Sequence, residues 1–193
     1  RLLEGTPGEP SKIEQGSAGL SCVWAEENTR AAIYDAMARR ETWDTSGTRM
    51  VVRVFGGFDF ATKPGDKDWT RVGYKKGVPM GGDLRRAAKG AAPQLLIAAS
   101  KDPNSGNLDR IQVIKGWVDA AGKSHDKIYD VVWSGNRKIG PDGKLPAVGN
   151  SVDIKNASYT NTIGSPELST VWKDPDFDPA VPAFYYVRVL EIP

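Results

Sequence analysis

The chain has 193 residues, of which 39% are hydrophobic and 26% are charged, as in an ordinary globular protein. Its formal net charge is +2 with acids and bases interleaved, so no basic surface for nucleic acid or an anionic membrane is expected. One cysteine and one histidine exclude a disulfide framework and a multi-histidine metal centre within this chain, and no apolar run approaches the roughly 18 residues that span a bilayer.

The first part of the chain predicts a loop, a strand and a helix, in that order. Residues 1–19 are rich in Gly and Pro and predict a loop or linker. "LSCVWA" (20–25) is a short apolar strand. Residues 26–40 predict a helix, because Thr29 or Asn28 can cap its N-terminus. A narrow stripe with helical spacing runs along it, at Ile33, Ala36, Met37 and Arg40.

From Thr48 onward the hydrophobic period changes from 3.6 to 2, which indicates strands. The predicted strands lie within residues 48–60, 93–100, 109–119, 126–134, 151–162 and 183–192. Gly56-Gly57 suggests a bulge, and Gly122 suits the left-handed position of a hairpin turn. We therefore expect an antiparallel β-sandwich preceded by one α-helix, with a boundary between residues 1–47 and 48–193.

An acidic loop at 102–109, "DPNSGNLD", offers oxygen ligands of the kind that calcium prefers. Asp102, Asn104 and Asp109 follow an order loosely similar to a calcium loop, but the closing bidentate glutamate is missing. Asx turns between two strands explain the same residues, so both interpretations stay open. The only histidine, His125, falls in the predicted hairpin turn, so we expect no cofactor bound by this chain alone.

Two further features have a structural and a functional interpretation. Glu26 and Glu27 stand between a strand and a helix, the position of the catalytic rim in a β/α barrel, but they also suit a helix N-terminus. Trp117 and Trp133 lie on the two arms of the predicted hairpin, where they form either a sugar-stacking surface or part of the core.

Nearly the whole chain resembles one known family. Residues 19–60, from "GLSCVWAEENTR" to "RVFGGFDF", are similar to the C-terminal region of the bacterial family domain of unknown function 3604. Later blocks of the same family are matched by "KGVPMGGDL", "NLDRIQVIKGWVD", "YDVVWSG", "TNTIGSPELSTVWKDPDFDP" and "FYYVRVLEIP".

That family is similar to the PHP (polymerase and histidinol phosphatase) metallohydrolases, so the resemblance implies a metal-dependent hydrolase acting on an unidentified small molecule. The helix would be the last of a β/α barrel, and residues 42–47 the hinge into the sandwich. The metal-binding histidines would belong to a missing N-terminal barrel portion, which would also hold the divalent metal ions. Bacterial origin is implied, whereas a periplasmic, secreted or cytoplasmic location stays open.

Within that parent protein, we expect five residues to line the rim of the active site. They are Glu26, Glu27, Arg30, Thr45 and Ser46. Arg30 would hold an anionic substrate group, and the glutamates would orient water or a basic residue. The rival interpretation is a non-enzymatic β-sandwich module that binds a carbohydrate or a protein partner. A third is a purely structural sandwich.

Overall fold

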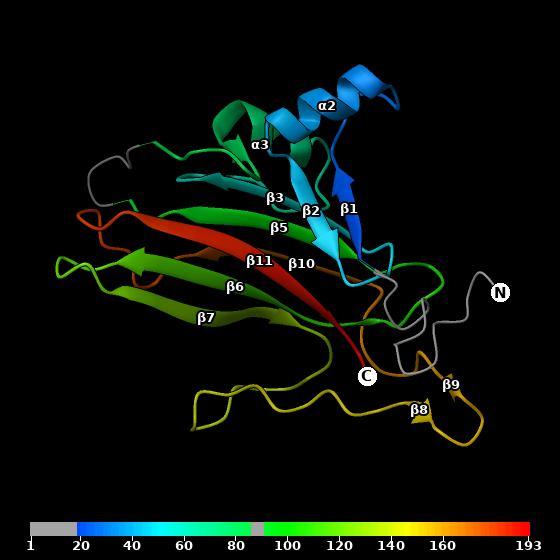
Figure 1. Cartoon of the computed structure of the whole chain (residues 1–193). Coiled ribbons are helices and arrows are strands. Elements are labelled where there is room, and N and C mark those ends of the chain that lie inside the picture. The colour runs from blue at the N-terminus through cyan, green and yellow to red at the C-terminus, as the bar shows by residue number, and fades with distance from the viewer. Residues whose placement is uncertain (1–18, 86–90) are drawn as a thin grey trace, which may run out of the picture.

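The computed structural model describes residues 19–85 and 91–193, and its regular structure is mainly antiparallel β (Figure 1). All of the loop predicted at 1–19 except Gly19 lies outside the described residues. The mainly β class expected from the sequence is confirmed.

A four-stranded sheet forms one large layer of the molecule. Its strands, in spatial order, are β10 (Glu167–Lys173), β5 (Gln94–Ser100), β3 (Val51–Gly57) and β4 (Val78–Pro79). The register between β3 and β5 is unbroken along all of β3, so the bulge predicted at Gly56-Gly57 is wrong. A Cβ on Gly57 would lie 2.5 Å from the ring of Phe60, so this glycine permits a close contact instead.

A three-stranded sheet forms the second large layer. Its strands, in spatial order, are β11 (Ala183–Glu191), β6 (Leu108–Val118) and β7 (Ser124–Trp133). β6 and β7 form the predicted hairpin, and Gly122 has the expected left-handed φ of 80°. His125 lies on β7 rather than in the turn itself, where its ring stacks on Trp117 and its Nε2 is 2.7 Å from Asp119 Oδ2.

The main hydrophobic core draws on alternate residues of both large sheets. Its buried members are Val52, Leu95, Ile97, Ala99 and Leu168 from the first sheet and Leu108, Ile111 and Val113 from the second. Alternation explains most of the pattern, because successive side chains of a strand point to opposite faces. Leu108 and Ile111 are three positions apart, because the register of β6 with β11 shifts between them at Asp109. Each large aliphatic side chain buried here contributes roughly 1.5–3 kcal/mol. Figure 1 shows both helices on the side of the four-stranded sheet that faces away from the three-stranded sheet.

The predicted helix is present as α2 (Arg30–Ala38). Thr29 is its N-cap, as expected, and its side chain accepts a hydrogen bond from the N–H of Ala32 at 3.3 Å. The predicted stripe is largely uncovered, because only Ala36 is buried and Met37 is 57% exposed.

A second helix, α3 (Trp69–Lys76), was not predicted, so the expectation of one helix is wrong. Trp69 and Val72 pack against a smaller core of Phe55, Phe60 and Leu96, on the outer face of the four-stranded sheet. Gly73 allows this approach, since a Cβ there would lie 2.5 Å from the ring of Phe55. Neither helix of the described part of the chain has the length and apolarity needed to traverse a bilayer.

Two small sheets complete the architecture. β1 (Leu20–Val23) pairs with β2 (Thr42–Thr45), so the first four residues of the expected hinge at 42–47 are a strand. The strand predicted within 151–162 is a hairpin of two short strands, β8 (Val152–Asp153) and β9 (Ser158–Tyr159). β10 was not predicted from the residue pattern, yet it pairs with β5 along its whole length.

Two ion-pair clusters stand at opposite ends of β6. At one end, Asp109 accepts hydrogen bonds from Arg110 Nε at 2.9 Å and from Arg137 Nη2 at 2.5 Å. At the other end, Lys115 Nζ lies 2.7 Å from Asp174 Oδ2, which also accepts a 2.6 Å hydrogen bond from the hydroxyl of Tyr185. Burial and the hydrogen bond to Asp174 raise the pKa of Tyr185 well above its usual range.

Candidate functional site

A cleft of about 820 Å³ lies between the β1–α2 loop, the end of α2, α3 and the outer face of the four-stranded sheet. Its size is that of a small-molecule site. The residues that line it are Trp24, Ala25, Glu26, Arg39, Glu41, Val51, Arg53, Trp69, Thr70, Tyr74, Pro79, Ala98 and Ser100. Charged side chains and aromatic rings therefore share one concave surface.

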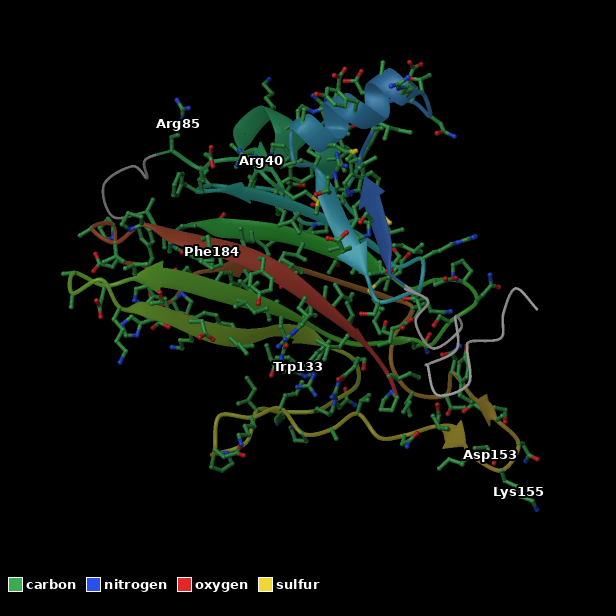
Figure 2. All side chains as sticks on the ribbon, in the orientation of Figure 1. Arg40, Arg85, Trp133, Asp153, Lys155 and Phe184 are labelled. Atoms are coloured by element: carbon green, nitrogen blue, oxygen red, sulfur yellow. The ribbon has the colours of Figure 1, made fainter. Side chains whose placement is uncertain are left out.

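Glu41 is the buried acid of this cleft, with an exposed fraction of only 2%. The end of α2 places it there. Arg40 adopts a left-handed φ of 63°, and the N–H groups of Arg40 and Glu41 donate to the carbonyls of Met37 and Ala36. This is a Schellman motif with arginine where glycine is usual, and Figure 2 shows Arg40 where the chain leaves α2. Glu41 thus enters the cleft because of how the helix ends.

Both carboxylate oxygens of Glu41 are engaged. Oε1 accepts a hydrogen bond from Arg39 Nε at 3.0 Å, and Oε2 accepts one from the hydroxyl of Tyr74 at 2.6 Å. Burial of the Tyr74 hydroxyl, and secondly its bond to Glu41, raise the pKa of Tyr74. The hydrogen bond to Glu41 raises the pKa of Arg39. Tyr74 is therefore a neutral hydrogen-bond donor at physiological pH.

Arg53 reaches the same cluster from β3. Its guanidinium carbon lies 4.3 Å from the ring centroid of Trp24 and 5.1 Å from that of Tyr74, and it donates a hydrogen bond to the Tyr74 hydroxyl. Trp24 is fixed in turn, because its Nε1 donates to the carbonyl of Val52 at 3.0 Å. Stacking on rings holds the flat face of a guanidinium while leaving its edge for hydrogen bonds.

Of the five predicted rim residues, only Glu26 lines this cleft. Glu27 is exposed and accepts a hydrogen bond from the hydroxyl of Thr29, the N-cap residue of α2. Arg30 lines a different, shallow surface along α2. Thr45 accepts a hydrogen bond from the N–H of Gly47, and Ser46 is exposed. The five residues are therefore not brought together in one place.

The acidic loop at 102–109 uses its oxygens within the protein. The carboxylate of Asp102 accepts a hydrogen bond from the backbone N–H of Asn104 at 2.9 Å, which is an Asx turn, and a long-range one from the backbone N–H of Arg49 at 2.7 Å. Asp109 is held by the two arginines described above. Among residues 19–85 and 91–193, no three His, Cys, Asp or Glu side chains gather as a metal site requires.

Sequence reasoning missed the residues that make this cleft distinctive, namely Glu41, Arg53, Tyr74 and Trp24. They come from four separate segments, so no local spacing joins them. One signal was present: Arg53 is a charged residue between the apolar neighbours Val52 and Val54, on a strand whose outer face is therefore partly polar.

The family model described as "Protein of unknown function (DUF3604)" matches residues 4–193. The chain belongs to this family. The match confirms the membership of domain of unknown function 3604 that the sequence indicates, and it spans every residue that lines the cleft of this DUF3604 chain. Comparisons with curated proteins and with solved structures found no match.

Proposed function

We propose that this DUF3604 chain is the C-terminal portion of a metal-dependent hydrolase related to the PHP proteins. In this proposal the two large sheets form a β-sandwich that follows the last helix, α2, of a β/α barrel. The barrel portion, encoded upstream, supplies the divalent metal ions, and the cleft beside α2 supplies contacts to a small-molecule substrate.

The observation that carries the proposal is the uncovered apolar side of α2. Tyr34 is 70% exposed and Met37 is 57% exposed, although both stand on a well-capped helix beside Ile33. Apolar side chains gathered on one helix face are normally covered by another element. A preceding barrel layer of the same protein is the cover that the family resemblance supports.

Glu26 connects the cleft with the proposed barrel. It follows β1 and precedes α2, and it lines the cleft together with the buried Glu41 and with Arg53. An acid between a strand and the next helix stands at the carboxyl rim when that unit belongs to a β/α barrel. Glu26 is then a residue that orients the substrate or the attacking water.

The test is a longer polypeptide that extends this chain upstream of Arg1. We expect it to copurify with stoichiometric divalent metal and to hydrolyse at least one of a panel of nitrophenyl phosphate, sulfate and carboxylate esters. Met37→Asp should make the longer polypeptide insoluble or less stable, since it places a charge in the interface. Ile154→Asp is the matched control, because Ile154 is 88% exposed on the β8–β9 turn. Absence of metal and turnover in the soluble longer protein would refute the proposal.

A second candidate function is a binding module for carbohydrate. Phe184 and Tyr186 on β11 are 62% and 51% exposed, and their rings are nearly parallel, 6.4 Å apart. Figure 2 labels Phe184 on this strand. The ring of Phe184 lies over Gly116, where an added Cβ would overlap it, so the missing side chain of this glycine makes room for the ring. Saturable binding of soluble glucans that is lost in Phe184→Ala would favour this function, whereas capture of a protein instead would favour a partner interface.

A further inference from the structure

The two arginines of the cleft have more hydrogen-bond donors than the protein uses. The side chain of Arg53 makes one hydrogen bond within the described residues, to Tyr74, and that of Arg39 makes one, to Glu41. A guanidinium carries five N–H donors. Both side chains line the cleft, and Arg39 is 45% exposed at its side chain. The cleft therefore presents unfilled guanidinium donors to a ligand.

The charge balance of the cleft favours an anion with a single charge over one with two charges. Arg39 and Arg53 oppose one buried carboxylate, Glu41, whose two oxygens are already engaged. Tyr74 is neutral, because its pKa is raised. Glu26 is exposed, but its charge also acts on Arg39, whose pKa it helps to raise. The two arginines and the two carboxylates of the cleft balance, so a monoanion adds one uncompensated negative charge beside Glu41, whereas a dianion such as a phosphate monoester adds two.

The remaining surface of the cleft suits a flat or apolar body. Trp69, Pro79 and Ala98 line it, and Trp24 presents an indole ring that already stacks on Arg53. The planar guanidinium of Arg53 is held by stacking on aromatic rings. A carboxylate is also planar, and its two oxygens can accept two parallel hydrogen bonds from a guanidinium.

We propose that this cleft binds an organic monocarboxylate, with the carboxylate on Arg53 and Arg39 and the organic body against Trp24 and Trp69. Arg53 is the central contact, and Tyr74 positions it through the hydroxyl hydrogen bond. The identification of this carboxylate as the substrate rests on the proposed hydrolase function. The binding itself is a property of the present chain and needs no metal.

The experiment follows the indole N–H resonance of Trp24 by NMR while the 193-residue chain is titrated with sodium benzoate. Benzyl alcohol is the neutral comparison, and phenyl phosphate at pH 8 is the dianionic one. We expect saturable shifts with benzoate and weaker binding, by about tenfold or more, of both other probes. Arg53→Gln should weaken benzoate binding by at least about tenfold, while Arg188→Gln, which alters a surface arginine bonded to Gln112, should leave it unchanged.

A second binding-site variant tests whether a loss of binding in Arg53→Gln comes from a defect in folding. Arg39→Gln alters a half-exposed side chain and should weaken benzoate binding severalfold with an unchanged circular dichroism spectrum. Equal binding of benzyl alcohol and benzoate, absence of saturable benzoate binding, or unchanged affinity in both arginine variants would overturn the inference. Benzoate binding without metal or turnover in the longer polypeptide would instead overturn only the proposed hydrolase.

Discussion

Replacing Asp174 with alanine should lower the free energy of unfolding by about 3–5 kcal/mol. The side chain of Asp174 has no exposed surface, and that of its partner Lys115 is only 7% exposed. Truncation leaves a buried ammonium group without its counter-ion, and it also removes the acceptor of the Tyr185 hydroxyl. Lys115 keeps one hydrogen bond, to the carbonyl of Asp176, which limits the loss.

Urea denaturation followed by tryptophan fluorescence measures this change. Asp178→Ala is the matched control, because Asp178 lies in the same acidic loop but is exposed, and its change should stay below about 1 kcal/mol. The double variant Lys115→Met/Asp174→Leu should recover most of the loss, since an apolar pair leaves no buried charge. A single variant within 1 kcal/mol of the parent, or a double variant as unstable as the single one, would show that burial of the ion pair is not what matters.

Three further predictions concern a turn, a carboxylate and calcium. In the same urea assay, Gly81→Ala should destabilise the protein by more than about 2 kcal/mol, because the φ of Gly81 is 81° and a Cβ there would overlap the carbonyl of Arg40. Gly122→Ala is the control: the φ of Gly122 is 80° but the space around it is open, so the change should cost only about 1 kcal/mol. Hydrogen bonds from backbone N–H groups lower the pKa of Asp102 in the folded protein. The stability that the ionised carboxylate contributes is therefore present above pH 3.8 and is lost as the pH falls through the lower folded pKa. Asp102→Asn should make the free energy of unfolding depend less on pH in that range. Added calcium should not raise the thermal midpoint, because the oxygens of Asp102 and Asp109 are already used; a rise that saturates with calcium would restore the calcium-loop hypothesis.

The parts of the fold that could be predicted are those that depend on neighbouring residues in the sequence. α2 carries its own cap at Thr29, and the β6–β7 hairpin carries the glycine that its turn needs. The local signal for α3 is weak, because Asp68, although of a residue type that caps helices, makes no side-chain cap, and Gly73 interrupts the helix. That glycine is required by Phe55, a residue of another strand, so tertiary packing decides the helix.

The candidate site was predictable only at Glu26. The strand, loop and helix around Glu26 are consecutive in sequence, so spacing alone draws attention to it. The position of Glu41 depends on how α2 ends, with a non-glycine residue in a left-handed conformation that no composition rule indicates. Tyr74 joins the cluster only because α3 packs on Phe55, and that contact is not local.

The placement of charged groups at both ends of β6 has a consequence for how this strand finds its partners. Asp109 and Lys115 are six positions apart on β6, and Asp109 is the residue that the register with β11 skips. A slip by one residue would turn both away from Arg137 and Asp174 and would set Arg110 and Gly116 in their places. A misaligned β6 therefore loses both ion pairs at once, so the two pairs together favour the observed register of this strand.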